Sequence, residues 1–435
     1  MRIRQTITSI MFSGILLTVC ALPALGQTTV SHSMTIPASS VAKPSEGGTR
    51  AHTNVILGSG PMTGVPQPAG EPPFPGYFFE TPASIACIYG LVPLTPGCNS
   101  NVVTENPSRG SRAIAIVDAY DYTAAAEDMA VFTSQFGVEP ASSFQVVYAP
   151  FGGSTPGSCS TTGPGPEPAS AAGTGWDIEE SLDTQYAHAM APQATLYLVE
   201  AQSESLPDLL CAVSVASNLV AQARGGEVSM SWGYSEPASF SAQYPMQTSM
   251  DPVFTKHGVV YFAAAGDGPG TLWPSTSPNV VSAGGTTLST DATTGNFLLE
   301  DAWQDAGGGP SIVEPRPDYQ NGIAYLVGKQ RGTPDVAAVA NPNTGVWIYN
   351  STYFGYGAWG IVGGTSVASP VIAGIVNAAG SFSASSHDEL GKIYSNPRGF
   401  TDTVFGNCGI YIGNFATLGW DFCTGWGSPR GYSGK

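Results

Sequence analysis

The strongest constraint on the fold is an alternation of short apolar segments with segments of helical periodicity. The apolar segments are expected to be buried strands, at residues 113–117, 194–199, 228–232, 259–264, 280–283, 336–339 and 346–349. Apolar residues with helical spacing predict helices over 123–136, 206–223 and 366–379. This alternation is typical of an α/β fold, with a mainly parallel central sheet and helices on both faces. Active sites in such folds lie at the carboxyl ends of the strands.

The N-terminal part of the chain is expected to lie outside that fold. Residues 1–26 predict a secretory signal peptide, because Arg2 and Arg4 precede an apolar run that is too short to span a membrane. Residues 27–76 are rich in Ser, Thr, Pro and Gly, and predict an N-terminal segment or short propeptide. The folded domain is expected to cover 77–435. The protein is thus predicted to be secreted and extracellular, without a membrane span.

The cysteines support an oxidising compartment. The chain has seven, and removal of the signal peptide with Cys20 leaves an even number. Many pairings are open from sequence alone. We expect the pairs Cys87–Cys98, Cys159–Cys211 and Cys408–Cys423. No Cys-x-x-Cys spacing suggests a zinc site.

The charge composition excludes one class of partner. Charged residues make up only 11% of the chain and the formal net charge is −17, so a nucleic acid is not an expected partner. A weakly charged, acidic chain also keeps its charge modest when carboxylates protonate, which suits low pH.

A glycine-rich segment supplies the candidate nucleophile. Residues 363–370 read Gly-Gly-Thr-Ser-Val-Ala-Ser-Pro and open the last predicted helix, so the backbone N–H of Ser366 can face a developing oxyanion. This motif resembles that of the subtilisin-like clan of serine peptidases. Subtilisins also use a histidine base, for which His188 with Asp118 is the nearest candidate pair. We expect both of these residues to be structural, so Ser366 needs another base.

Two carboxyl groups can provide it. Glu179 and Asp183 are four residues apart, one turn along a predicted helix. Two carboxyl groups so close share a proton, which leaves one carboxylate available as a base in acid, where an imidazole is protonated. The Glu-x-x-x-Asp pair, the following Ala191-Pro192 and the Ser366 motif together resemble the sedolisin family of serine-carboxyl peptidases.

That resemblance extends to the oxyanion site and the substrate site. Asp267 follows a predicted strand in Ala-Gly-Asp-Gly, where sedolisins carry an Asp, and only a protonated Asp can donate a hydrogen bond to the oxyanion. The segment that contains Ser231, Trp232 and Gly233 resembles the strand on which the family binds an extended peptide.

The resemblance also implies one structural calcium ion near the C-terminus. Carried over by position, the ligands are the side chains of Asp402 and Asp421 and the backbone carbonyls of Thr403, Thr417 and Gly419. The family usually has Gly where this chain has Thr417.

The similarity runs from about Thr81 to Pro429 and implies a subtilisin-like fold. The function predicted is a monomeric, acid-acting serine-type endopeptidase that hydrolyses polypeptides through an acyl-enzyme, with Ser366, Glu179 and Asp183 as triad and Asp267 at the oxyanion. Sedolisins usually carry a large prodomain, whereas here only residues 27–76 precede the domain. The chain could fold without a prodomain, use a short propeptide, or be an inactive descendant. The main alternative function is therefore a non-catalytic secreted binding protein on a degenerate peptidase fold.

Overall fold

The computed structural model of the chain describes residues 33–42, 50–59, 65–70, 72–74, 76–236, 247–354, 358–409 and 414–434. The predicted signal peptide, 1–26, lies outside the described residues. Among the described residues, no helix is long and apolar enough to cross a membrane.

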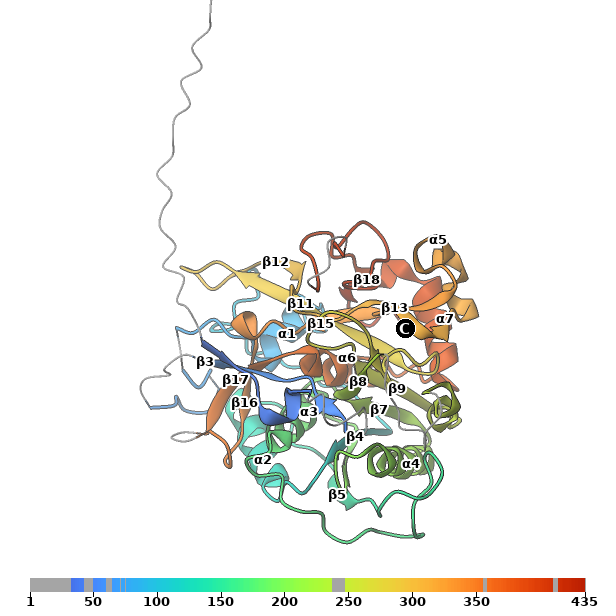
Figure 1. Cartoon of the computed structure of the whole chain (residues 1–435). Coiled ribbons are helices and arrows are strands. Elements are labelled where there is room, and N and C mark those ends of the chain that lie inside the picture. Colours follow the sequence, from blue (N-terminus) through green and yellow to red (C-terminus); the bar gives the residue numbers. More distant parts are fainter. Residues whose placement is uncertain are drawn as a thin grey trace, which may run out of the picture. The chain divides into compact units, whose positions relative to one another are not determined.

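An eight-stranded sheet lies at the centre of the fold (Figure 1). Its strands are β4 Ala113–Ala119, β5 Phe144–Tyr148, β6 Thr195–Ala201, β7 Gly226–Met230, β9 Val259–Ala264, β11 Val281–Thr290, β12 Phe297–Ala302 and β15 Val336–Val339. The order is β12-β11-β9-β7-β4-β6-β5, and β15 also pairs with β11. Every pairing is parallel except that of β11 with β12. The predicted mainly parallel α/β fold is confirmed.

Helices cover both faces of this sheet. The described residues form α1 Pro82–Ile88, α2 Ala125–Phe136, α3 Trp176–Met190, α4 Leu206–Gln222, α5 Ala324–Val327, α6 Thr365–Ala379 and α7 Ser386–Ser395. Of these, α3, α4 and α6 make most of the helix contacts with the central strands. Alternate residues of β9 show the two faces: Val259 and Tyr261 pack in a cluster with residues of α4, whereas Val260 and Phe262 pack in a cluster with residues of α3 and α6. Helix α3 lies between α6, α2 and β4 and is buried along its whole length.

Smaller antiparallel sheets flank the centre. One has the order β1-β3-β17-β16 and another the order β10-β8-β2. Their strands are β1 Ser33–Thr35, β2 His52–Thr53, β3 Ile56–Ser59, β8 Trp232–Ser235, β10 Leu272–Trp273, β16 Val346–Tyr349 and β17 Trp359–Gly363. The predicted strand 346–349 is therefore present, but in a flanking sheet. Two-stranded sheets join β13 Gly309–Pro315 to β14 Gln330–Thr333 and β18 Phe400–Thr401 to β19 Ser428–Pro429.

The segment that precedes the predicted domain start at Tyr77 contributes to these sheets. Strand β3 lies between β1 and β17, and β2 pairs with β8. The packed structure thus includes residues of the segment 27–76, which composition predicted to be an N-terminal segment or short propeptide. The pattern of apolar residues did not predict these strands, because each is only a few residues long.

The three expected disulfides, Cys87–Cys98, Cys159–Cys211 and Cys408–Cys423, are all present. The first and third close short loops, while the second ties the loop after β5 to helix α4.

Candidate active site

Three neighbouring strands place polar side chains at one edge of the central sheet. Strand β4 ends with Asp118 and Ala119, β7 is followed by Ser231, and β9 is followed by Asp267. These strands are adjacent in the order β9-β7-β4 and parallel, so their carboxyl ends meet at the same edge. Asp118, Ser231 and Asp267 therefore lie at one edge of the central sheet.

Ser366 lies in the first turn of α6, directly over that edge. Its hydroxyl donates a hydrogen bond to the carbonyl of Ser231 at 3.2 Å. Its backbone N–H donates to the carbonyl oxygen of Asn54 at 3.0 Å. Gly364, the residue before the helix, has a φ of +104°, and a Cβ there would overlap with the Asn54 carbonyl oxygen and with Asp267 Oδ2. Position 364 therefore requires glycine, because any side chain there would prevent the Asn54 carbonyl and Asp267 from lying so close to the start of α6.

Glu179 and Asp183 lie one turn apart on α3, which packs against α6. Both side chains are 0% exposed. The Ser231 hydroxyl donates to Asp183 Oδ1 at 2.9 Å and lies 3.2 Å from the carbonyl of Ser366, so it links the two helices. Asp183, Ser231 and Ser366 thus form one connected polar cluster.

Burial controls the protonation of this pair. It raises the pKa of Glu179 well above its usual range, and the neighbouring Asp183 and Asp118 raise it further. The nearby Ser366 hydroxyl opposes that shift. Neither carboxylate oxygen of Glu179 has a hydrogen-bond partner among the described residues, and the same holds for Asp183 Oδ2. These oxygens are available to exchange a proton.

Asp267 faces the same point from the other side. Its Oδ1 accepts hydrogen bonds from the Thr365 N–H at 2.7 Å and the Thr365 hydroxyl at 2.8 Å. Its Oδ2 is buried and unpartnered among the described residues, and lies beside the Asn54 carbonyl oxygen next to Gly364. Burial raises the pKa of Asp267 to about 7, against the opposing effect of the Thr365 hydrogen bonds. In acid, Oδ2 can therefore carry a proton and act as a donor.

His188 does not belong to this cluster. Its Nε2 is 2.8 Å from the carbonyl oxygen of Glu139, and burial lowers its pKa. The expectation that His188 is structural fits this position. Asp118, which was also expected to be structural, is fully buried; burial raises its pKa to about 8, and it raises the pKa of both Glu179 and Asp183. It therefore interacts electrostatically with the acids of α3.

Comparisons with known proteins point to one family. Sedolisin of Pseudomonas sp. (strain 101) is 36% identical over 175 residues, which cover 36% of this chain and 28% of sedolisin. Kumamolisin of Bacillus sp. (strain MN-32) is 32% identical over 297 residues, which cover 59% of this chain and 50% of kumamolisin. The chain is thus similar in sequence to peptidases of the sedolisin family. It spans half or less of the length of these curated relatives.

A solved structure agrees with the fold of this chain. The structure of Pseudomonas sedolisin, a serine-carboxyl proteinase complexed with two molecules of pseudo-iodotyrostatin, superposes with a TM-score of 0.61. It is 23% identical in sequence and covers 81% of this chain and 95% of its own. The subtilisin-like fold is confirmed. No family model matches the chain.

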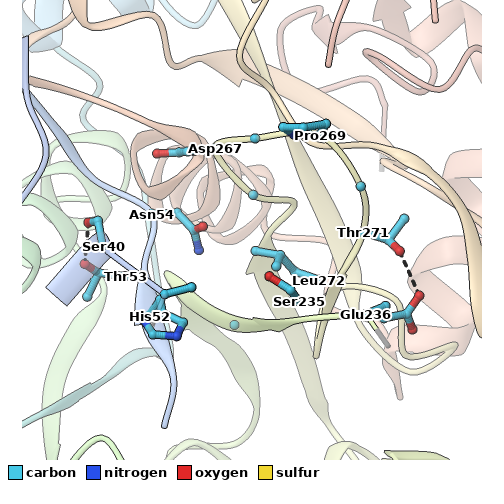
Figure 2. A pocket seen from close by; sticks show the side chains of 15 residues that line it. Ser40, His52, Thr53, Asn54, Ser235, Glu236, Asp267, Pro269, Thr271 and Leu272 are labelled. Atoms are coloured by element: carbon cyan, nitrogen blue, oxygen red, sulfur yellow. Dashed lines mark hydrogen bonds between the residues drawn. The ribbon is translucent and has the colours of Figure 1, made fainter. Parts of the chain in front are cut away.

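The segment predicted to bind substrate includes strand β8, and a pocket lies beside this strand. Ser231 precedes β8, which contains Trp232 and Gly233 and lies between β10 and β2. A cavity of about 160 Å³ lies between β8, the segment His52–Asn54 and the loop from Gly266 to Leu272. Figure 2 shows Asn54 and Asp267 on its wall, with Glu236 bonded to Thr271 away from them.

The predicted calcium ligands gather in the C-terminal loops. The N–H of Gly419 donates to Asp402 Oδ2 and that of Thr417 to Asp421 Oδ2, both at 2.8 Å. Asp421 Oδ1 accepts from the N–H groups of Cys423 and Thr424. Asp402 Oδ1 and the Thr403 hydroxyl are buried and unpartnered among the described residues. Oxygens without a hydrogen-bond partner suit a hard cation. The carboxylate oxygens of Asp421, in contrast, already accept hydrogen bonds from N–H groups of the loop. The described residues contain no cluster of three or more His, Cys, Asp or Glu that could hold a metal.

Three residues of the site were not singled out from the sequence: Thr365, which orients Asp267, Asp118 in its electrostatic role, and Asn54. Thr365 could have been found as the neighbour of Ser366 in the same motif. Asp118 had a weaker signal, an acidic residue at the end of a fully apolar strand. Asn54 had none, because 312 residues separate it from the side chain it contacts.

Proposed function

We propose that this chain is a serine-carboxyl endopeptidase, which hydrolyses internal peptide bonds of polypeptides in acid through an acyl-enzyme on Ser366. The observation that carries the proposal is the convergence of three buried acids on the hydroxyl and amide of one helix-opening serine. Ser366 follows β17, Glu179 and Asp183 lie on α3, and Asp267 lies in the loop after β9. The catalytic roles follow from the chemistry of each group.

Glu179 would take the proton of the Ser366 hydroxyl as the oxygen attacks the peptide carbonyl carbon, and would return it to the leaving amine. Asp183 would share the proton of Glu179 and is held by the Ser231 hydroxyl. Since desolvation and their closeness disfavour a charge on both carboxyls at once, the pair would share one proton and leave one carboxylate to accept the proton of Ser366. Water would then hydrolyse the acyl-enzyme by the same route.

The Ser366 N–H and protonated Asp267 would stabilise the oxyanion. Both groups lie beside the Asn54 carbonyl oxygen, which accepts a hydrogen bond from the Ser366 N–H. Donors aimed at a developing negative charge in a water-poor site are a large source of rate enhancement. Ionised Asp267 would repel the same charge, which links activity to acid.

The groove favours cleavage within a chain over removal of short N-terminal pieces. The chain's own segment continues upstream of Asn54, where the Ala51 N–H donates to the carbonyl of Glu204 at 2.9 Å and Arg50 pairs with Glu204. The groove therefore accommodates several residues on the N-terminal side of the residue that contacts Ser366. A peptide with a blocked N-terminus would fit equally well.

The test is the pH dependence of cleavage of an N-acetylated, internally quenched peptide. We expect kcat/KM to be highest in acid and to fall about tenfold per pH unit above pH 7, as Asp267 loses its proton. The Asp267→Asn variant has an amide donor at every pH, so its lower activity should not show that fall.

Ser366→Ala is the inactive control, and a fluorophosphonate probe should label the wild type but not this variant. Failure of the probe to label Ser366, together with no cleavage at any pH, would favour the non-catalytic binding protein instead. A wild-type profile that peaks at neutral pH would contradict the role of Asp267.

We also propose that Asp402, Asp421 and the carbonyls of Thr403, Thr417 and Gly419 hold one structural calcium ion. The bound ion would tie β18 to the loop before β19, which the Cys408–Cys423 disulfide also braces. Removal of calcium with EGTA should lower the melting temperature by several degrees, with recovery on adding calcium but not magnesium.

Asp402→Asn should abolish this calcium response, whereas Glu127→Gln, at an exposed position on α2, should leave it intact. Equal melting temperatures with EGTA and with calcium would rule the ion out.

For location, we propose secretion to the extracellular space. Three disulfides favour an oxidising compartment, and the predicted signal peptide supplies a route.

A further inference from the structure

The cavity beside the candidate active site is where one substrate side chain would lie. Asn54 marks the position of that substrate residue, because its carbonyl oxygen accepts a hydrogen bond from the Ser366 N–H at 3.0 Å, as the carbonyl of a scissile bond would. Asn54 also lines the cavity of about 160 Å³ that lies between β8 and the loop from Gly266 to Leu272. The shape of this cavity therefore bears on which residue can precede the scissile bond.

Leu272 occupies the space between two walls of this cavity. One wall is β8, where a Cβ added at Gly233 would lie 3.2 Å from Leu272 Cδ1. The other wall is the segment before Asp267, where a Cβ added at Gly266 would lie 2.9 Å from the same Leu272 atom. Figure 2 shows Leu272 with Asn54 on one side and Thr271 on the other. A single methyl group of Leu272 thus lies close to both walls and makes the cavity shallow at this point.

The side chain of Asn54 fits a shallow cavity. Its Nδ2 donates a hydrogen bond to the carbonyl oxygen of Ser231 at 3.3 Å, so the amide lies against the backbone that precedes β8. A side chain of this size does not need the space of Leu272. A large side chain such as that of Phe would need it, because two groups cannot share one closely packed volume.

The backbone holds Leu272 at this position. Leu272 pairs with Ser235 in the ladder of β10 and β8, and its carbonyl oxygen accepts the N–H of Thr276 at 2.9 Å. The neighbouring Thr271 is buried, and its hydroxyl donates to Glu236 at 2.7 Å. The loop therefore cannot withdraw its leucine from the cavity without losing these contacts.

We propose that Leu272 restricts the proposed peptidase to cleavage after small side chains, such as those of Gly, Ala and Ser. This inference rests on the proposed function and names its substrate class. Leu272 would contact the substrate side chain and not the reacting atoms, so it should decide which peptide is cut. A misfit of one methylene in an apolar pocket changes kcat/KM by about 10- to 200-fold, and Phe exceeds Ala by much more than a methylene.

The experiment compares two N-acetylated, internally quenched peptides that differ only in the residue before the scissile bond, Ala in one and Phe in the other. In acid, the full-length wild type should cleave the Ala peptide with a kcat/KM at least about a hundredfold higher than the Phe peptide. Leu272→Ala should raise kcat/KM for the Phe peptide at least about tenfold and change that for the Ala peptide by only a few-fold. Mass spectrometry of the products identifies the bond that is cut.

Two control variants separate the size of the side chain from other effects of substitution. Leu272→Met has a similar volume and should keep the wild-type preference. Leu298→Ala removes an exposed leucine on β12, outside the cavity, and should keep that preference too. Because the wild-type preference is measured without any substitution, the inference can be judged even if Leu272→Ala does not fold.

Two results would overturn the inference and leave the proposed function standing. One is a wild type that cleaves the Phe peptide as well as the Ala peptide. The other is a folded Leu272→Ala variant, as judged by circular dichroism, that keeps the wild-type ratio.

A wild type that cuts neither peptide is tested further with denatured casein. If casein is cut, the residues before the cut bonds, identified by mass spectrometry, decide in the same way. If casein also stays intact at every pH and the fluorophosphonate probe does not label Ser366, the proposed function fails and the inference fails with it.

Discussion

Glu179→Gln should lower kcat/KM for a quenched peptide in acid by about a thousandfold or more, without unfolding the protein. The amide keeps the size of the side chain but cannot take the proton of Ser366, and removal of a base that acts with a serine nucleophile has effects of about this size or larger. Because Glu179 is fully buried and its oxygens have no hydrogen-bond partner among the described residues, the neutral amide should be tolerated. Initial rates and circular dichroism at the same pH would measure both effects.

Glu180→Gln is the matched control. Glu180 is the adjacent residue, is equally buried, and also has a strongly raised pKa from desolvation. It should keep activity within a few-fold, because its carboxyl interacts mainly with Glu200 and Asp118, and Ser366 is not among the groups that shift its pKa. Loss of activity in Glu180→Gln with retention in Glu179→Gln would reverse the assignment.

Stability should fall steeply as pH rises from about 4 to 8. Burial raises the pKa of Asp118 to about 8 and that of Glu200 to about 9, and raises those of Glu179, Glu180 and Asp183 well above their usual range. The unfolded chain ionises these groups near pH 4, so it binds fewer protons than the folded chain above that pH. Each such group then lowers the free energy of unfolding by about 1.4 kcal/mol per pH unit, up to its folded pKa.

The melting temperature should therefore be higher at pH 4 than at pH 7, by about 10 °C or more when several groups contribute. Glu180→Gln removes one titrating group and should make the dependence shallower, whereas Glu127→Gln, at an exposed position on α2, should not change it. A wild-type protein more stable at pH 7 than at pH 4 would show that the buried acids are ionised in the fold.

Much of the central sheet was predictable because each strand is a continuous apolar run. The predicted strands 259–264, 336–339 and 346–349 have the bounds observed for β9, β15 and β16. Sheet membership was not predictable for β16, since pairing with β17 and not with the central strands depends on long-range contacts. Strand β5 was missed, since its residues are only partly buried and the apolar pattern is correspondingly weak.

The candidate active site was also predictable only in part. Motifs with local spacing identified Ser366, Glu179, Asp183 and Asp267, which the fold brings to one edge of the sheet. Sequence alone could not show that Asp118 interacts with the α3 acids, because that depends on how α3 packs over β4. The contact between Asn54 and Ser366 joins distant parts of the chain, and no local pattern encodes it.

The position of β3 bears on how the protein should be produced. A recombinant chain that began at Tyr77, as composition suggests, would lack β3 and leave the edge of β17 open. Exposed edges invite pairing between molecules. Since β17 runs directly into Gly364 and Ser366, such a shortened protein risks aggregating through the very strand that presents its nucleophile.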